Sequence, residues 1–171
     1  MKQKHMCSKG LLAAGAMLAL LGSAVPSTAL ADPDFSIHLP AGLACAGFDL
    51  LIEVTENPQR VYREFYDKSG NVVRYISAGK GNDLTVMNLS TGARLTLKAN
   101  GSVEKTRFNT DGTVTSTAMG HNLIIFFPTD NPPGPSTTLY VGRVVWNVDT
   151  SGIWTLVSTA GDSTDICAEL E

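Results

Sequence analysis

Apolar and polar residues alternate with a period of two along most of this chain. In the segment 48–55, Phe48, Leu50, Ile52 and Val54 fall on one side, and polar residues fall mostly on the other. Successive side chains of a β-strand point to opposite faces, so this pattern predicts a strand with one buried face. Beyond the first 31 residues, no ten-residue segment has convincing helical spacing, which indicates an all-β chain.

Similar segments follow at short intervals, separated by turn-forming residues. The strongest turn signal is Asn100-Gly101, because both central positions of a type I′ turn need positive φ. The apolar segment 121–127 is typical of a central strand covered on both faces, and the long segment 137–148 is predicted to bend at Gly142. The remaining predicted strands are 60–67, 72–77, 84–89, 93–99, 102–109, 113–118 and 152–159.

Loops of two to four residues join most of these segments, so neighbours in sequence are expected to pair in space. That arrangement is an antiparallel meander, and a long meander leaves two open edges unless it curls. The predicted fold class is therefore all-β, with the meander forming either an up-and-down barrel, lipocalin-like in shape, or a two-sheet sandwich. Apolar residues on both faces of several strands favour the barrel. Short helices are expected only near residues 41–45 or at the end of the chain.

The segment 128–136 breaks the strand pattern, because it holds four of the eight prolines. Proline has no backbone N–H and cannot donate to a strand ladder, so this proline-rich loop is predicted to be extended and on the surface. Two roles are open for it, namely a rim or lid over a cavity or a long crossover between two sheets.

The first 31 residues have the order of a secretory leader. Three lysines precede an uncharged apolar run at 11–21, and Ala29-Leu30-Ala31 places small residues where a signal peptidase recognises them. The run is too short to cross a bilayer as a helix. We therefore expect residues 1–31 to be a cleaved signal peptide, residues 32–171 to form a single β domain, and the protein to be secreted and extracellular.

Charge narrows the range of partners. The leader contains three of the 13 basic residues and none of the 16 acidic ones, so the rest of the chain carries a net charge of 10 − 16 = −6. Nucleic acids and anionic membranes need a basic face on their partners, so neither is expected as a partner. No second apolar segment reaches the length of a membrane-spanning helix, so no span is expected.

Two cysteines, Cys45 and Cys167, remain after the leader. An even pair in an exported protein predicts a disulfide, which joins the start of the domain to its end. In the chain-entropy account, closing a loop of roughly 120 residues is worth about 5 kcal/mol. The alternatives are a reactive thiol or a metal pair, but two cysteines without nearby histidines make a poor zinc site.

The sequence carries none of the usual catalytic signatures. After the leader it has two histidines, His38 and His121, and it lacks a Gly-x-Ser-x-Gly nucleophile elbow. It also lacks metal-ligand spacing, calcium loops and phosphate-binding loops, so neither a metal nor a cofactor is expected. His121 begins the most apolar strand, where it serves either as a base or as a strand-end histidine bonded to a carbonyl.

Aromatic side chains give another candidate site. Tyr140 and Trp146 share a face of the long segment, and Trp154 lies on the next one. Flat rings on a sheet can stack on sugars or line an apolar pocket, and ordinary cross-strand packing is the alternative. Further rings on the early strands are Tyr62, Tyr66 and Tyr75.

Arg143 is the one basic residue within the apolar stretch 139–148. It can face an acidic ligand group, pair with Asp49 or Glu53, or extend into solvent. The candidate ligand-binding residues are therefore Tyr140, Arg143, Trp146, Trp154 and His121.

Four stretches of the chain form a distinctive set, namely Cys45–Leu50 (CAGFDL), Val61–Phe65 (VYREF), Gly134–Val145 (GPSTTLYVGRVV) and Thr164–Cys167 (TDIC). Together they resemble a group of small exported proteins of actinobacteria whose activity is uncharacterised. The resemblance covers most of the chain after the leader and includes both cysteines. It implies a Gram-positive, high-GC source and an extracellular address, and it supplies no catalytic or binding residue.

Three classes of function fit these patterns. The favoured one is an exported module that binds a small apolar or aromatic ligand. The second is a structural or interaction protein of the cell envelope, which predicts an exposed apolar patch. The third is a barrel enzyme, a cyclase, isomerase or hydrolase, which needs His121, Arg143 and a carboxylate to converge. The sequence favours a binding protein over an enzyme.

Overall fold

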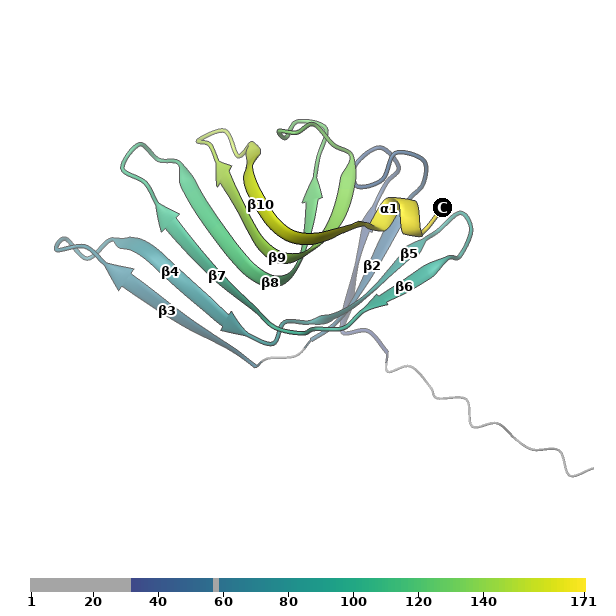
Figure 1. Ribbon diagram of the computed structural model, residues 1–171, viewed down its shortest axis with the longest axis horizontal. Helices are drawn as coiled ribbons and strands as arrows, with labels where there is room; N and C mark the ends of the chain where they lie inside the picture. Colours follow the sequence, from purple (N-terminus) through teal and green to yellow (C-terminus); the bar gives the residue numbers. More distant parts are fainter. Residues whose placement is uncertain (1–31, 57–58) are drawn as a thin grey trace, which may run out of the picture. The chain divides into compact units, whose positions relative to one another are not determined.

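The computed structural model describes residues 32–56 and 59–171. The expected signal peptide lies outside these residues, so its cleavage stays a prediction. The described residues are almost entirely β, as predicted (Figure 1). The elements are β1 (Phe35–Leu39), β2 (Leu50–Thr55), β3 (Arg60–Tyr66), β4 (Val72–Gly79), β5 (Asp83–Asn88), β6 (Arg94–Leu97), β7 (Ser102–Phe108), β8 (Val114–Phe126), β9 (Ser136–Val148), β10 (Trp154–Asp165) and α1 (Ile166–Glu169).

The strands form two antiparallel sheets that do not close into a barrel, which selects the second of the two predicted architectures. The four-stranded sheet has the order β1-β2-β5-β6, and the six-stranded sheet has the order β10-β9-β8-β7-β4-β3. The meander prediction is correct for β7 to β10 and for the consecutive pairs β1–β2, β3–β4 and β5–β6, but it is wrong where β2 pairs with β5 and β4 pairs with β7. The chain leaves the four-stranded sheet after β2, forms the β3–β4 hairpin in the other sheet, and then returns for β5 and β6. Because each sheet keeps its own edges, no barrel interior forms.

The four-stranded sheet buries one face. Phe48, Leu50, Ile52 and Val54 are at most 5% exposed, which confirms the face predicted from their alternation. Together with Val86 they form a core. The side chains that complete this core from the six-stranded sheet and the C-terminal helix are Leu123, Ile125, Leu139, Ile166 and Leu170.

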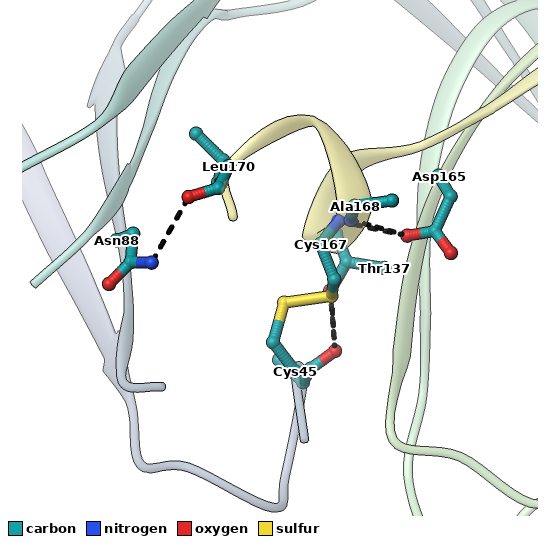
Figure 2. Close-up of a disulfide and its surroundings, with 8 residues drawn as sticks. Cys45, Asn88, Thr137, Asp165, Cys167, Ala168 and Leu170 are labelled. Carbon is teal, nitrogen blue, oxygen red and sulfur yellow. Dashed lines mark hydrogen bonds between the residues drawn. A yellow bond between two sulfur atoms is a disulfide. The ribbon is translucent and has the colours of Figure 1, made fainter. Parts of the chain in front are cut away.

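A disulfide between Cys45 and Cys167 fastens the two ends of the described chain together (Figure 2). Their Cα atoms are 5.5 Å apart, which confirms the predicted pairing. Beside it, the buried Thr137 hydroxyl donates a hydrogen bond of 3.0 Å to the carbonyl of Ala44. The segment before β2 is therefore tied to both β9 and the C-terminus.

The short C-terminal helix was predicted at this position, whereas residues 41–45 form turns and bends instead of a helix. Asp165 caps α1, since its carboxylate accepts hydrogen bonds from the N–H groups of Cys167 and Ala168. Asn88 of β5 donates from Nδ2 to the carbonyl of Leu170 at 3.1 Å. These bonds dock the end of the chain on the four-stranded sheet (Figure 2).

The two longest strands, β8 and β9, are bent (Figure 1). Gly120 of β8 pairs with Gly142 of β9. The φ angles are +100° at Gly120 and +140° at Gly142, and other L residues rarely adopt such angles. A Cβ atom on Gly142 would overlap the carbonyl oxygen of Ala160 in β10. The bend that the sequence predicted at Gly142 is therefore present, and it has a counterpart in β8.

The bend lets the end of β8 contact two cores. Leu123 and Ile125 pack on the four-stranded sheet. On the other face, Ile124 and Phe126 belong to a second core with Ala118, Val144 and Trp146. The prediction that this segment is covered on both faces is confirmed for 123–126, whereas Phe127 is 38% exposed. The predicted strands 113–118 and 121–127 belong to one strand, β8.

The proline-rich loop joins β8 and β9, which are neighbours in one sheet, so it is not a crossover between sheets. Asp130 is 7% exposed, and its carboxylate accepts hydrogen bonds from the N–H groups of Phe127 at 2.7 Å and Trp154 at 2.9 Å. Asn131 N–H donates to the carbonyl of Trp154, and Leu156 N–H donates to the carbonyl of Asn131. The loop therefore covers the first part of the β10 edge.

Candidate functional site

The outer strands of the six-stranded sheet present polar and aromatic side chains on one face. Two rows cross β3, β4 and β7 on this face. One row pairs Glu64 with Tyr75, and Tyr75 with Thr106. The other row consists of Tyr62, Ser77 and Glu104. Side chains that pair across strands lie about 5 Å apart, so the two rows form one continuous surface.

A hollow of about 560 Å³ lies over these strands. Figure 1 shows β3 and β4 on the side of the six-stranded sheet away from β2, β5 and β6. The volume falls within the range of small-molecule sites. We call this hollow the β3–β4–β7 groove, and its lining residues are Arg60, Tyr62, Glu64, Tyr75, Ser77, Ser102 and Glu104.

Arg60 closes one end of the groove by reaching across two strands. Its Nε donates to Oγ of the buried Ser77 at 2.9 Å, and its Nη1 donates to Oγ of Ser102 at 3.0 Å. The same Nη1 lies 3.4 Å from the carbonyl oxygen of Gly79. These three oxygen atoms hold the guanidinium in a fixed position, in the same groove as the carboxylates of Glu64 and Glu104.

Glu104 is held at the centre of the groove. Its Oε1 accepts hydrogen bonds from the hydroxyl of Thr106 at 3.0 Å and from the hydroxyl of Tyr75 at 3.4 Å. The Thr106 hydroxyl is also 2.8 Å from the hydroxyl of Ser116. The Tyr75 ring packs at a tilt against Phe108, with 6.2 Å between ring centroids. These contacts fix both the carboxylate and the aromatic ring.

The outer wall of the groove is more exposed. Tyr62 is 70% exposed on the edge strand β3. The Tyr66 hydroxyl donates a hydrogen bond to the carboxylate of Glu64, and this bond raises the pKa of Tyr66 above its ordinary value. The wall therefore offers one freely accessible ring beside a carboxylate that already accepts one hydrogen bond.

The combination of carboxylates, an arginine and tyrosine rings in the groove suits a ligand with hydroxyl groups. Carboxylates accept hydrogen bonds from hydroxyls, and an arginine donates to them. Tyrosine rings offer a flat apolar surface with a polar end. A sugar presents C–H groups on its faces and hydroxyls at its edges, so both kinds of surface find a counterpart in the groove.

The aromatic residues proposed from the sequence lie elsewhere on the same sheet. Trp146 and Trp154 stack with 5.4 Å between centroids and 6° between ring planes. Trp146 is buried, and Tyr140 and Trp154 are partly buried against the second core. Burial raises the pKa of Tyr140. These rings are packed side chains, which was the alternative that the sequence left open for them.

The other two candidates, His121 and Arg143, are separate from the tryptophans. His121 borders a small cleft of about 60 Å³ whose other walls include Leu84 and Leu97 of the four-stranded sheet. Arg143 is exposed on the opposite face of the six-stranded sheet from Trp146, and its Nη1 donates to the Ser158 hydroxyl at 3.3 Å. The five proposed residues therefore do not form one site.

Within the described ranges 32–56 and 59–171, no group of three or more histidine, cysteine, aspartate or glutamate side chains is placed to hold a metal ion. No helix in this part of the chain is long and apolar enough to span a bilayer.

Some of the groove residues could be predicted from the sequence. Alternation in 60–67 puts Tyr62 and Glu64 on one face, and the early tyrosines were noted as possible sugar platforms. The pairing of β4 with β7 is what brings Glu104 beside them, and the sequence predicted pairing only between consecutive strands.

Comparisons with known proteins give no further assignment. No protein-family model, no curated protein and no solved structure matches the chain.

Proposed function

We propose that this protein is an exported binding module that holds a neutral, hydroxyl-rich ligand, such as an oligosaccharide, in the β3–β4–β7 groove. The observation that carries the proposal is the juxtaposition of exposed Tyr62 and fixed Tyr75 with the carboxylates of Glu64 and Glu104. Rings and hydrogen-bonding groups converge on one open surface, as they do in small-molecule sites.

The geometry favours this ligand class over the apolar ligand expected from the sequence. An enclosed apolar ligand needs a barrel interior, and the two sheets do not form one. The tryptophans that were expected to line such a pocket pack against Phe126 and Val144 instead. The barrel-enzyme alternative depends on the same missing interior, and a binding role needs only the open groove.

Export is the second part of the proposal. The leader pattern in residues 1–31 and the Cys45–Cys167 disulfide support it, because disulfides persist in oxidising compartments. The resemblance to small exported actinobacterial proteins points to the same extracellular address. In that setting, cell-surface and free glycans are available ligands.

The test is a titration of the purified protein with neutral β-glucan, xylan and mannan oligosaccharides by calorimetry. We expect at least one to bind, and we expect Tyr62→Ala to weaken that binding about tenfold, or about 1.4 kcal/mol, because the variant loses the apolar ring surface that the sugar would cover. Phe35→Ala is the matched control, since Phe35 is an exposed ring on β1, outside the groove. No binding by any of the three, or equal affinities of both variants, would overturn the proposal.

A further inference from the structure

The face of the six-stranded sheet opposite the groove carries five exposed cations, which we call the basic face. They are Arg63 on β3, Arg74 on β4, Lys105 and Arg107 on β7, and Arg143 on β9. Three rows of paired residues cross the sheet on this face, and none of the residues in these rows is acidic. Half of the basic residues that follow the leader are thus gathered on one surface.

The alternation of side chains along the strands produces this separation of charge. Arg63 precedes Glu64 in β3, and Lys105 follows Glu104 in β7. Neighbouring residues of a strand point to opposite faces, so the carboxylates enter the groove and the cations reach the other side. The six-stranded sheet therefore has one positive face, although the chain carries a net negative charge.

The cations lie one or two strands apart across the sheet. Arg74 and Arg107 pair directly in neighbouring strands, about 5 Å apart by sheet spacing. Arg63 and Lys105 share a row with one strand between them, and the strand of Arg143 lies two strands beyond that of Lys105. Those two-strand steps are about 10 Å each. The positive charge forms an extended track rather than a pocket for one small anion.

A hollow of about 840 Å³ lies at the Arg74–Arg107 end of this track. Its walls include Phe65, and the guanidinium carbons of Arg74 and Arg63 lie 4.0 Å and 5.3 Å from the centroid of that ring. Cation–π contact orients the arginines without neutralising them. One carboxylate, Asp111, stands at the rim, where it accepts hydrogen bonds from the backbone N–H and hydroxyl of Thr113.

We propose that the basic face binds a linear anionic polysaccharide, a glycan with carboxylate or sulfate groups at regular intervals. A single guanidinium donates two parallel hydrogen bonds to such a group, and the spacing of the track fits charges that recur along a chain. The turns at this end of the strands carry Asp67, Asp111 and Asp149, and Asp111 lines the hollow on this face. These carboxylates repel a duplex nucleic acid or an anionic bilayer, because negative charge is dense over the whole of such a surface. They repel a glycan with spaced charges less. This inference is independent of the groove.

The experiment measures binding of the purified protein to polygalacturonate and dextran sulfate, with neutral dextran as the uncharged comparison. We expect both polyanions to bind, neutral dextran not to bind, and affinity to fall as salt rises, because bound counterions are released. The double variant Lys105→Gln/Arg107→Gln should weaken binding at least tenfold and flatten the salt dependence. The control Arg94→Gln/Lys98→Gln removes the same charge from the β6 region and should change affinity less than twofold.

Tryptophan fluorescence reports whether each variant is folded, and Arg74→Gln provides a second variant if the double variant does not fold. Absence of binding to both polyanions at low salt would overturn the proposal. So would equal losses in the two double variants, which would indicate attraction to net charge alone. Tighter binding to duplex DNA or to phosphatidylglycerol vesicles than to either polysaccharide would also overturn it, because the partner would then be of another class.

Discussion

At the scale of single residues, positive-φ glycines decide where the long strands turn. Gly120 and Gly142 pair at the bend, and a side chain on Gly142 has no room beside the β10 backbone. The bend carries the end of β8 and the start of β9 to the four-stranded sheet, where Leu123 and Leu139 pack. A small residue thus sets the position of a large hydrophobic contact.

Replacing Gly142 by alanine should destabilise the protein by at least about 2 kcal/mol, because the positive φ and the overlap with Ala160 both cost energy. Gly152→Ala is the control. Gly152 also has a positive φ, of +83°, but a Cβ there meets nothing within 4 Å, so about 1 kcal/mol is expected. Urea unfolding followed by tryptophan fluorescence measures both. Equal losses would contradict the role given to the bend.

At the scale of elements, the sheet edges are protected in different ways. The proline-rich loop covers the start of β10 through Asp130 and Asn131. At the other edge, β3 leaves Val61 and Tyr62 exposed beside the charged Arg63 and Glu64. Charged side chains on an open strand discourage pairing with a second chain.

Asp130→Ala should therefore release the loop from β10. The carboxylate satisfies two backbone N–H groups and is itself buried, so the expected loss is about 3 kcal/mol. Faster amide exchange at Trp154 and Leu156 should accompany it. Asp149→Ala is the matched control, since Asp149 also accepts two backbone N–H bonds but lies in an exposed turn. A loss of stability no larger than that of the control would contradict this account.

The aspartates in the turns predict how stability depends on pH. Backbone and side-chain hydrogen bonds from Asn71 lower the pKa of Asp67 below 3.8, and bonds from Thr113 lower the pKa of Asp111. Their stabilising effect is present above the unfolded pKa and is lost as pH falls through the lower folded value. Unfolding free energy should therefore decline below about pH 4, and Asp67→Asn should make that decline shallower. An unchanged slope in urea titrations would argue against it.

At the scale of the whole molecule, the sequence predicted the chemistry of each strand better than the pairing between strands. The buried face of 48–55, the bend at Gly142 and the Cys45–Cys167 bond follow from local pattern or from counting, and all three are present. The β2–β5 and β4–β7 pairings join strands that are not consecutive, so local rules could not find them.

The groove and the basic face depend on those same non-consecutive pairings. Glu104 meets Ser77, and Arg107 meets Arg74, only because β7 lies beside β4. The net charge of the chain could not reveal the basic face, because strand alternation places the acidic and basic residues on opposite faces of the sheet. The sequence indicated Tyr62 and Tyr75 as candidate stacking platforms, but it did not predict which polar side chains lie beside them.

The disulfide acts on the whole chain, because it closes a loop between residues 122 positions apart. Its reduction should lower the free energy of unfolding by about 4–5 kcal/mol, mainly because the unfolded chain gains conformational entropy when the loop is no longer closed. Urea unfolding with and without a phosphine reductant measures this, and Cys45→Ala/Cys167→Ala should reproduce the reduced value. A reduced protein with the same unfolding midpoint would show that the bond contributes no stability.

We propose that this protein holds its ligand in the β3–β4–β7 groove. The most direct test is an amide chemical-shift titration of the isotope-labelled protein with the neutral oligosaccharide that binds best in calorimetry. We expect shifts concentrated on β3, β4 and β7, around Tyr62, Tyr75 and Glu104. Shifts centred instead on Trp146 and Trp154, or on the cleft beside His121, would contradict it.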